Sequence, residues 1–446
     1  MSLAQGLINK MYMSYDELPK LSLPHNQEVF ISDSTLRDGS QMPGIVISVD
    51  DRVKIFEYLH RIGIEKLEVF LFSKSDKEAA LRMLDHGFEF PEVTGWARSN
   101  TGDIDLVLGM DGIDETGILM SVSNAHILTK MGLPSKEAAR KKYLDALDYA
   151  LDHGLRTRAH LEDVTRADLE GFVYPLAREI LDRDPDCTLR LCDTIGFGLP
   201  FCDLGQPFGV PQMITRLREM GARNIETHTH DDFSLATANS LIGYWYGANW
   251  SNLTFLGIGE RAGNAELEKV LLFLSQRMAG MDKYDLSCLV EFADYIEEHI
   301  GVYVPKNKAV VGKNIFAHES GIHAAGVLKD PFTYEPFPPT LVGCERKLMI
   351  GPSSGSEIVR AKVEEALRDL MKIETRISKD DWRVRAIHDE IRQLYDDGQR
   401  KSCISDREIR AYAEKYFMFN PLLSKVTRRR DEEIHHDHPE GSGGQG

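Results

Sequence analysis

The sequence predicts an α/β protein built on a (βα)8 TIM barrel, with a smaller, mostly helical region after it. Between about residues 28 and 305, short β-prone runs alternate with longer amphipathic stretches, and the runs recur roughly every 27 to 40 residues. Side chains capable of chemistry stand at or near the ends of these runs, and in a closed parallel barrel such positions converge on one face. They are Arg37, Asp38, Glu68, His126, Glu162, Arg166, Asp193, Thr194, His228, His230 and residues 260–264.

The strand-like runs number eight, which favours a closed barrel over a doubly wound open sheet, the alternative architecture. No GxGxxG motif opens a helix after the first run, and this is a further argument against a dinucleotide-binding fold. In the stretch VDDRVKIFEYLHRIG, apolar residues follow helical spacing and Gly63 can end the helix. The eight runs are EVFISDSTL, KLEVFLF, EVTGWA, TGILMSVS, RTRAHLE, TLRLCD, NIETHTH and NLTFLGIG.

The character of the chain changes near its two ends. We expect an N-terminal extension over residues 1–27, a catalytic barrel over 28–304, a C-terminal linker with helical subdomains over 305–425, and a disordered tail over 426–446. The tail is charged and Gly-rich, which is typical of disorder. Three histidines in the tail would otherwise suggest a metal site, and they are His435, His436 and His438.

Composition excludes several classes of function. The formal net charge is -17, and so acidic a surface repels nucleic acid, although a local Arg or metal can still bind a small anion. No run of about 18 apolar residues and no secretory signal is present, so we expect no membrane partner. The six cysteines form no CxxC pair. These features are typical of a cytoplasmic protein with reduced thiols.

His228 and His230 are the sharpest local signal for a metal. Side chains at i and i+2 of a strand point to the same side, although an isolated HxH more often places one histidine in a core and one on a surface. Asp38 follows the first strand and Asn264 follows the eighth, and these strands are neighbours in a closed barrel. Two nitrogens and two oxygens could therefore hold one Zn, Mn, Co or Mg ion and leave positions for a chelating substrate.

Two further motifs have both a structural and a functional interpretation. Arg37 in STLRDGSQ could stabilise a developing enolate or alkoxide beside a metal, or it could bridge barrel carboxylates. Arg166 in HLEDVTR and Thr194 in CDTIG suit a substrate carboxylate, or they could pair within the barrel. The glycines of GIGERAGN either form a simple tight turn or shape the backbone that brings Asn264 to the metal.

Together these motifs resemble the DRE-TIM metallolyases, the family of isopropylmalate synthase and homocitrate synthase. The resemblance runs from about residue 29 to 355, through DSTLRDGSQ, SNAH, EDVTR, DTIGFGLP, HTHDDFSLATAN, GIGERAGNAELE and HESGIHAAGVLKDPFTYE. It implies a divalent metal cofactor and a Claisen condensation of acetyl-CoA with a 2-oxo acid. EFPEVTGWAR and HLEDVTRAD look closest to Re-type citrate synthases and phosphinomethylmalate synthases, which use oxaloacetate or an isostere.

The resemblance also implies roles for individual residues. The metal ligands would be Asp38, His228, His230 and Asn264. The catalytic residues would be Arg37, Glu226, His323, Tyr334 and Glu319. The substrate-binding residues would be Arg166, Thr194, His126 and Gln41. In the family, the segment that contains His323 and Tyr334 reaches into the active site of a partner subunit, which implies a homodimer with exchanged C-terminal segments.

The sequence departs from the family pattern at three places. Asp231 and Ser234 replace the usual Asn and Gly after the HxH motif, and GPSSG at residues 351–355 replaces GKHSG. The alternatives are a homocitrate or isopropylmalate synthase, an acyl-CoA lyase of the same superfamily, or a barrel that binds a metabolite without turnover. The HESGIH segment and the helical C-terminal region favour a synthase over a lyase. The absence of a leucine-feedback domain argues against a regulated isopropylmalate synthase.

Overall fold

The computed structural model describes residues 14–204, 207–372 and 374–418. The chain divides into two compact units. The barrel unit comprises Glu17–Ile315 and Thr340–Cys344, and the C-terminal unit comprises Met1–Asp16, Phe316–Pro339 and Glu345–Gly446. The expected tail at 426–446, with its three histidines, lies outside the described residues.

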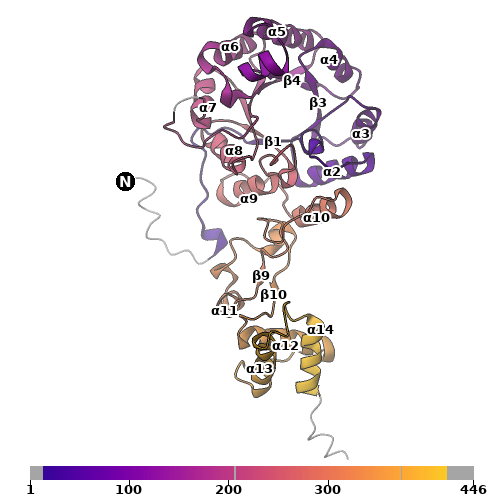
Figure 1. Ribbon diagram of the computed structural model, residues 1–446, viewed down its shortest axis with the longest axis vertical. Helices are drawn as coiled ribbons and strands as arrows, with labels where there is room; N and C mark the ends of the chain where they lie inside the picture. The colour runs from indigo at the N-terminus through magenta and orange to yellow at the C-terminus, as the bar shows by residue number, and fades with distance from the viewer. Residues whose placement is uncertain (1–13, 205–206, 373, 419–446) are drawn as a thin grey trace, which may run out of the picture. The chain divides into compact units, whose positions relative to one another are not determined.

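Eight parallel strands of the described barrel unit close into a barrel, as the sequence predicts (Figure 1). Each strand pairs with the next along the chain, and β1 closes the ring against β8 through the register Phe30↔Trp250 to Asp33↔Leu253. The strands are β1 (Phe30–Asp33), β2 (Lys66–Val69), β3 (Glu92–Arg98), β4 (Glu115–Ser121), β5 (Arg156–Glu162), β6 (Thr188–Asp193), β7 (Asn224–Thr229) and β8 (Trp250–Leu253).

Helices surround the barrel and bury one apolar face each. In α2, the capping box of Ser48 and Asp51 starts the helix, and Gly63 ends it with φ of 94°. The helices are α2 (Val49–Ile62), α3 (Lys74–Asp85), α4 (Thr101–Leu108), α5 (Lys136–Asp152), α6 (Tyr174–Arg183), α7 (Val210–Glu219), α8 (Ala236–Trp245), α9 (Leu267–Arg277) and α10 (Leu289–Tyr295).

Short 3-10 and π-helical segments lie in the connections of the barrel unit. Several of them follow the carboxyl ends of strands, where the candidate site residues stand. They are η2 (Gly39–Gln41), η3 (Ala125–Lys130), η4 (Val164–Arg166), η5 (Leu169–Val173), η6 (Phe255–Gly257) and η7 (Ile296–Ile300).

The C-terminal unit is small and mostly helical, as predicted. Its strands β9 (Ala317–His318) and β10 (Lys347–Leu348) pair in parallel. Its helices are α11 (Gly321–Lys329), α12 (Ser356–Met371), α13 (Trp382–Asp396) and α14 (Asp406–Ala413). A buried cluster of aliphatic side chains from α12, α13 and α14 forms its core. Among the described residues, none of the helices has the length and apolar character that crossing a membrane requires.

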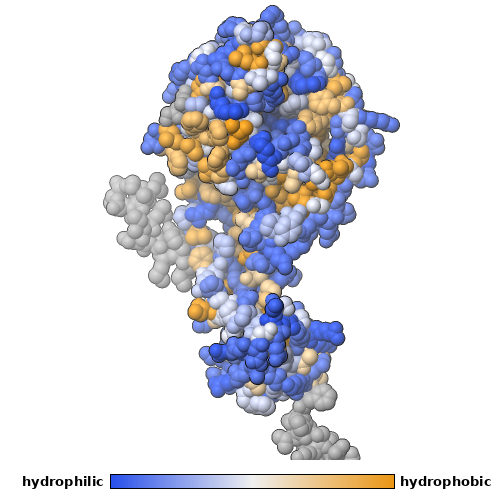
Figure 2. Space-filling view, in the orientation of Figure 1, coloured by the Kyte–Doolittle hydropathy of each residue, from blue (hydrophilic) through white to orange (hydrophobic). Residues whose placement is uncertain are grey.

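The interior of the barrel contains charged side chains in place of the usual aliphatic layers. Arg190 on β6 contacts Glu68 on β2, and these strands are not neighbours, so the contact crosses the interior. Figure 2 shows hydrophilic residues at the centre of the barrel unit on the face in view. The charged or titratable interior residues, each exposed by 4% or less, are Glu68, Glu115, Arg158, His160, Arg190 and Glu226.

His160 should make the stability of the barrel depend on pH. Burial, with Arg190 nearby, lowers its pKa from 6.5 to about 3. Between these values the unfolded chain binds a proton that the folded chain does not, so stability falls as pH drops through 6.5. From pH 7.5 to 5.5 this one group should cost about 1.4 kcal/mol.

Equilibrium urea unfolding at the two pH values measures this cost. The decrease in unfolding free energy should be smaller in His160→Gln than in wild type by that amount. An equal decrease in both proteins would show that folding does not change the pKa of His160.

Candidate metal centre and active site

A tight turn after β1 presents Arg37 and Asp38 at the barrel mouth. The backbone N–H groups of Arg37, Asp38 and Gly39 all donate to the carbonyl oxygen of Ser34, at 3.0, 2.8 and 3.0 Å. Both side chains are buried, with Asp38 only 3% exposed. These hydrogen bonds therefore hold the backbone that carries the Asp38 carboxylate, although Asp38 lies beyond the end of β1.

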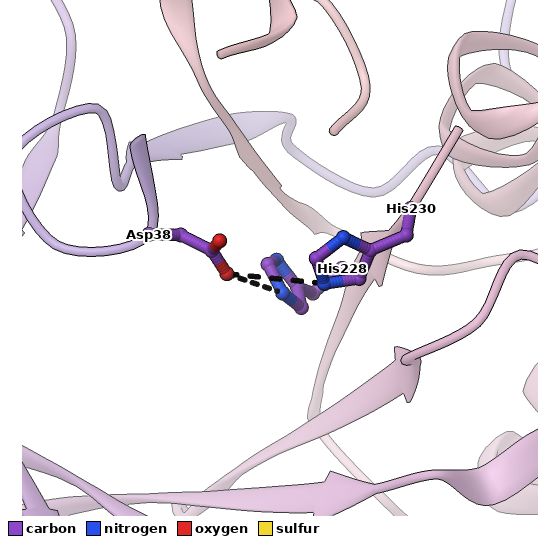
Figure 3. A group of neighbouring side chains, drawn as sticks. All are labelled: Asp38, His228 and His230. Carbon is purple, nitrogen blue, oxygen red and sulfur yellow. Dashed lines mark ion pairs between the residues drawn. The ribbon is translucent and has the colours of Figure 1, made fainter. Parts of the chain in front are cut away.

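His228, on β7, and His230, one residue past the end of β7, bring two imidazoles to the same point. The Nε2 atoms of His228 and His230 lie 3.3 and 3.9 Å from Oδ2 of Asp38 (Figure 3). One possible ligand atom from each of the three residues lies within 4.8 Å of the others. The centroids of the two rings lie 5.1 Å apart, and the ring planes are 83° to one another.

Asn264 joins this cluster through the backbone of the loop after β8. His230 and Asn264 form an antiparallel bridge. A side chain at Gly259 would lie 2.2 Å from Nδ2 of Asn264 and 3.3 Å from Oδ1 of Asp38, so both residues adjoin this glycine. The glycine-rich loop thus leaves the space in which the two oxygen-bearing side chains meet, which agrees with the functional interpretation of GIGERAGN.

The four residues fit a divalent cation. The Nε2 atoms of both histidines face Asp38. Oδ1 of Asp38 and Oδ1 of Asn264 are buried polar atoms with no hydrogen-bond partner in the described part of the chain. Such atoms are rare in folded proteins unless another group satisfies them.

The protonation of the cluster also suits a cation. Burial raises the pKa of Asp38, but Arg37 and His228 together hold it well below its usual range. Burial and the neighbouring His228 lower the pKa of His230 to about 4. A charged carboxylate and a neutral imidazole are the forms that bind metal.

Arg37 lies between two carboxylates. Its Nη1 donates to Oδ2 of Asp38 at 2.9 Å, and its Nε donates to Oε1 of Glu68 at 2.6 Å. The side chain is 7% exposed. Both interpretations of Arg37 from the sequence therefore have support, because the guanidinium bridges barrel carboxylates and also adjoins the metal cluster.

Arg166 and Thr194 meet at Asp163, a buried residue that the sequence analysis did not single out. Arg166 donates to Asp163 through Nη2 at 2.7 Å and through Nε, and the backbone N–H of Asp163 donates to Oγ1 of Thr194 at 2.9 Å. Asp163 is fully buried, whereas the Arg166 side chain is 35% exposed. The arrangement holds the Arg166 guanidinium and the Thr194 hydroxyl near each other, at the carboxyl ends of β5 and β6.

His126 belongs to a second charged group at the same end of the barrel. Its Nδ1 lies 3.0 Å from Oε2 of Glu162, and Lys130 donates to Oε1 of Glu162 at 2.6 Å. Glu162 pairs in register with Cys192, which pairs with His228, so these positions share one level of the wall. Burial raises the pKa of Glu162, but His126 and Lys130 bring it to about 2.

Gln41 and Glu226 differ sharply in their surroundings. Gln41 is exposed in η2, three residues after Asp38. Glu226 is fully buried, and its oxygens accept hydrogen bonds from Ser32 Oγ and Arg190 Nε, both at 2.5 Å. Burial raises the pKa of Glu226, but Arg158 and Arg190 hold it at about 2. This placement favours an organising charge in the core over a group that takes a proton from substrate.

The remaining three expected catalytic residues lie in the C-terminal unit. His323 and Tyr334 are exposed, and their ring centroids lie 4.3 Å apart with the ring planes tilted by 38°. The Glu319 carboxylate accepts a hydrogen bond from Ser353 Oγ at 3.3 Å and adjoins Cys403. The catalytic roles of these residues stay predictions.

Two departures from the family pattern have a clear structural setting. Ser234 has φ of 58°, a left-handed conformation that glycine adopts without strain, so the usual Gly at this position is understandable. Asp231 accepts a hydrogen bond from the backbone of Ala236 at 2.9 Å, at the first residue of α8. Its carboxylate therefore secures the start of the helix that follows the two histidines.

The charged core is what sequence reasoning missed most. Arg158 and Arg190 have no assigned role in the motifs, yet both are almost completely buried. The signal was present in RTRAHLE, where Arg158 and His160 alternate with apolar residues in a strand otherwise suited to a core. Alternation of charge with apolar residues places such side chains on one face of a strand, here the interior.

Loss of one imidazole should abolish tight metal binding. His230→Ala removes a nitrogen ligand, so we expect the dissociation constant for Mn²⁺ to rise at least about 100-fold. Isothermal titration calorimetry measures this change. His153→Ala, an exposed histidine on the barrel unit, is the control and should bind as wild type does. Unchanged binding in His230→Ala would remove this residue from the ligand set.

Comparison with known proteins agrees with this geometry. Residues 28–296 match the family model described as HMGL-like, and residues 310–399 match the model described as Homocitrate synthase post-HMGL domain-like. The first match spans the barrel with its cluster of possible metal ligands. The second spans the segment that contains His323 and Tyr334.

Individual proteins give the same result. The chain is 36% identical over 424 residues to a citrate (Re)-synthase from Clostridium kluyveri, covering 90% of this chain and 92% of that protein. It is 36% identical to a homocitrate synthase from Methanopyrus kandleri, covering 78% and 84%.

A solved structure supports the fold alone. The hydroxymethylglutaryl-CoA lyase from Pseudomonas aeruginosa superposes with a TM-score of 0.51 at 23% identity, covering 64% of this chain and 96% of that one. The chain therefore belongs to the HMGL-like family, the DRE-TIM metallolyases, and carries a segment of homocitrate synthase type after its barrel.

Proposed function

We propose that this protein joins the acetyl group of acetyl-CoA to the keto carbon of an oxaloacetate-like 2-oxo acid and hydrolyses the thioester. The products would be CoA and citrate, formed in the Re sense, or a phosphinomethylmalate-like acid. The observation that carries the proposal is the cluster of Asp38, His228 and His230 beside Arg37, in a chain that matches a citrate (Re)-synthase along most of its length.

The cluster and Arg37 supply an electrophilic site. A divalent cation bound there (Mn, Mg, Co or Zn) would act as a Lewis acid toward the keto oxygen. Arg37 places its guanidinium next to Asp38, where it can donate hydrogen bonds to negative charge that develops on that oxygen. Because Arg37 is buried, its donors face little competition from water.

Residues at the ends of β5 and β6 are suited to the substrate carboxylates. Arg166 and Thr194 lie together around Asp163, and we assign them the 2-oxo acid carboxylate. His126 lies beside them and Gln41 lies beyond Asp38, and we retain both as substrate-binding residues. A substrate with two carboxylates would be favoured here over one with an apolar tail, because Arg166 and Lys130, each beside a carboxylate of the chain, offer charged donors at this edge of the mouth.

Condensation also needs a base, since the methyl protons of acetyl-CoA are too weakly acidic for water alone. We assign this role to His323, with the Tyr334 ring in contact with it and Glu319 as its assistant. By analogy with the family, the base would come from a partner subunit in a homodimer with exchanged C-terminal segments. Glu226 is better assigned to the core, because both of its oxygens are already engaged by buried donors.

The main alternatives are a homocitrate or isopropylmalate synthase and an acyl-CoA lyase. The match of residues 310–399 to the post-barrel segment of homocitrate synthases favours condensation over cleavage. The two condensing alternatives differ only in the 2-oxo acid, so substrate preference distinguishes them.

Release of free CoA tests the reaction directly. The metal-loaded protein is incubated with acetyl-CoA, Mn²⁺ or Mg²⁺, and each of oxaloacetate, 2-oxoglutarate, 2-oxoisovalerate, pyruvate and phosphinopyruvate. Thiol release should be fastest with oxaloacetate or phosphinopyruvate, the short 2-oxo acids with a second anionic group. Pyruvate and 2-oxoisovalerate lack that group, and 2-oxoglutarate carries it one carbon further from the keto carbon. A preference for 2-oxoglutarate or 2-oxoisovalerate would support an alternative synthase, and no release with any acid would refute condensation.

The base has its own test. His323→Ala should lower kcat by about 100-fold or more, within the usual contribution of a general base. Lys329→Ala, an exposed residue on the same helix α11, serves as the matched control and should retain wild-type turnover. Near wild-type turnover in His323→Ala would transfer the role to another group.

A further inference from the structure

Arg190 is a fully buried charge with no place in the mechanism described above. It lies on β6 inside the barrel and is 0% exposed. Its two carboxylate partners, Glu68 and Glu226, are also 0% exposed. Burying such charges costs several kcal/mol per ion before pairing, and aliphatic residues often serve a core as well or better. Paired charges of this kind can hold other side chains in position.

The contacts of Arg190 lead directly to the metal cluster. Its Nη1 donates to Oε1 of Glu68 at 3.0 Å, and its Nε donates to Oε2 of Glu226 at 2.5 Å. The same oxygen of Glu68 accepts the Nε of Arg37 at 2.6 Å. Arg37 in turn reaches Asp38 with Nη1. One carboxylate oxygen therefore serves two guanidinium groups, one in the core and one at the mouth.

We propose that Arg190 is a positioning residue that fixes the guanidinium of Arg37 beside Asp38 by sharing Glu68. This inference rests on the proposed function, in which Arg37 acts on the keto oxygen. While Arg190 occupies Oε1 of Glu68, that carboxylate attracts Arg37 less strongly. Without Arg190, the full charge of Glu68 is available to Arg37, which would move away from Asp38 and the reacting carbonyl.

Glu226 is the second group that holds Arg190 in place. It holds the Nε of Arg190, and Ser32 and Arg158 hold Glu226 from two other strands. Arg190 is therefore restrained by Glu226 as well as by Glu68. The result is a rigid series of charges of alternating sign, which suits a donor that must be in place before the transition state forms.

Arg158 provides a matched control within the same core. It is 1% exposed and pairs with Glu115 at 2.8 Å and with Glu226 at 3.3 Å. Its closest approach to Glu68 is 3.9 Å, beyond hydrogen-bonding distance. Replacing Arg158 or Arg190 by Met removes the same buried charge, but only Arg190 touches the carboxylate that Arg37 uses.

Kinetics separates positioning from stability. In Arg190→Met we expect kcat to fall about 10- to 100-fold, less than the loss of a whole oxyanion donor, with KM for the 2-oxo acid and Mn²⁺ affinity within about threefold of wild type. Arg158→Met should lower the melting temperature comparably and keep kcat within about threefold, because Ser32 and Arg190 still donate to Glu226. Arg190→Lys, which keeps the charge but not the fork geometry, should recover part of the lost kcat.

Crystal structures grown without added metal give a readout that does not require turnover. In Arg190→Met, Nη1 of Arg37 should leave Oδ2 of Asp38 and approach Glu68. In Arg158→Met it should stay. If Arg190→Met does not fold, Arg190→Lys takes its place in both measurements, with a smaller shift of Arg37 and a smaller loss of kcat expected.

The outcomes distinguish the two proposals. Wild-type kcat and an unmoved Arg37 in the Arg190 variant would overturn the positioning role. Equal losses of kcat in the Arg158 and Arg190 variants would reduce the effect to general damage of the core. If wild type itself releases no CoA with any 2-oxo acid, the proposed function fails, while the two crystal structures still decide whether Arg190 holds Arg37.

Discussion

The guanidinium of Arg37, held between Asp38 and Glu68, is the contact on which the rest of the site depends. It joins a charged barrel interior to the cluster of possible metal ligands at the mouth. Asp38 is thereby kept ionised against the cost of its burial, and only an ionised carboxylate serves as a ligand. In the proposed reaction the same guanidinium stabilises the charge that develops on the substrate, so one side chain would connect stability with chemistry.

Closure of the barrel is the second requirement. Asp38 and Asn264 are separated by more than half of the chain, and they meet because β1 pairs with β8. The two histidines come from β7, next to β8 in the ring, and the backbone bridge of His230 to Asn264 ties the two connections together. A doubly wound sheet of the same strands would not make β1 and β8 neighbours, so the candidate site exists only in the closed architecture.

The core of this barrel is both charged and rigid, although buried charges usually cost stability. Charged residues inside a protein are costly unless each is paired. Here carboxylates and guanidiniums alternate along one series of contacts, from Glu115 through Arg158, Glu226 and Arg190 to Glu68. Their pairing makes the interior rigid, because each group is held by partners on other strands. Several of these side chains keep a polar atom without a hydrogen-bond partner among the described residues, as expected for a network that is not packed to completion.

The sequence by itself determined the eight-unit barrel, the strand positions and the motifs that meet at its mouth, because period-2 and helical patterns and turn signals are local properties. Placement of Asp38, His228 and His230 side by side followed from the rule that strand ends of a parallel barrel share one face.

Only the tertiary structure decided which charges are buried together. Nothing local in Glu226 distinguishes a proton acceptor from a core ion, and nothing local in Arg190 shows that it shares a carboxylate with Arg37. Pairing across the barrel joins residues from strands that are distant in the chain, and both burial and pKa follow from that long-range packing.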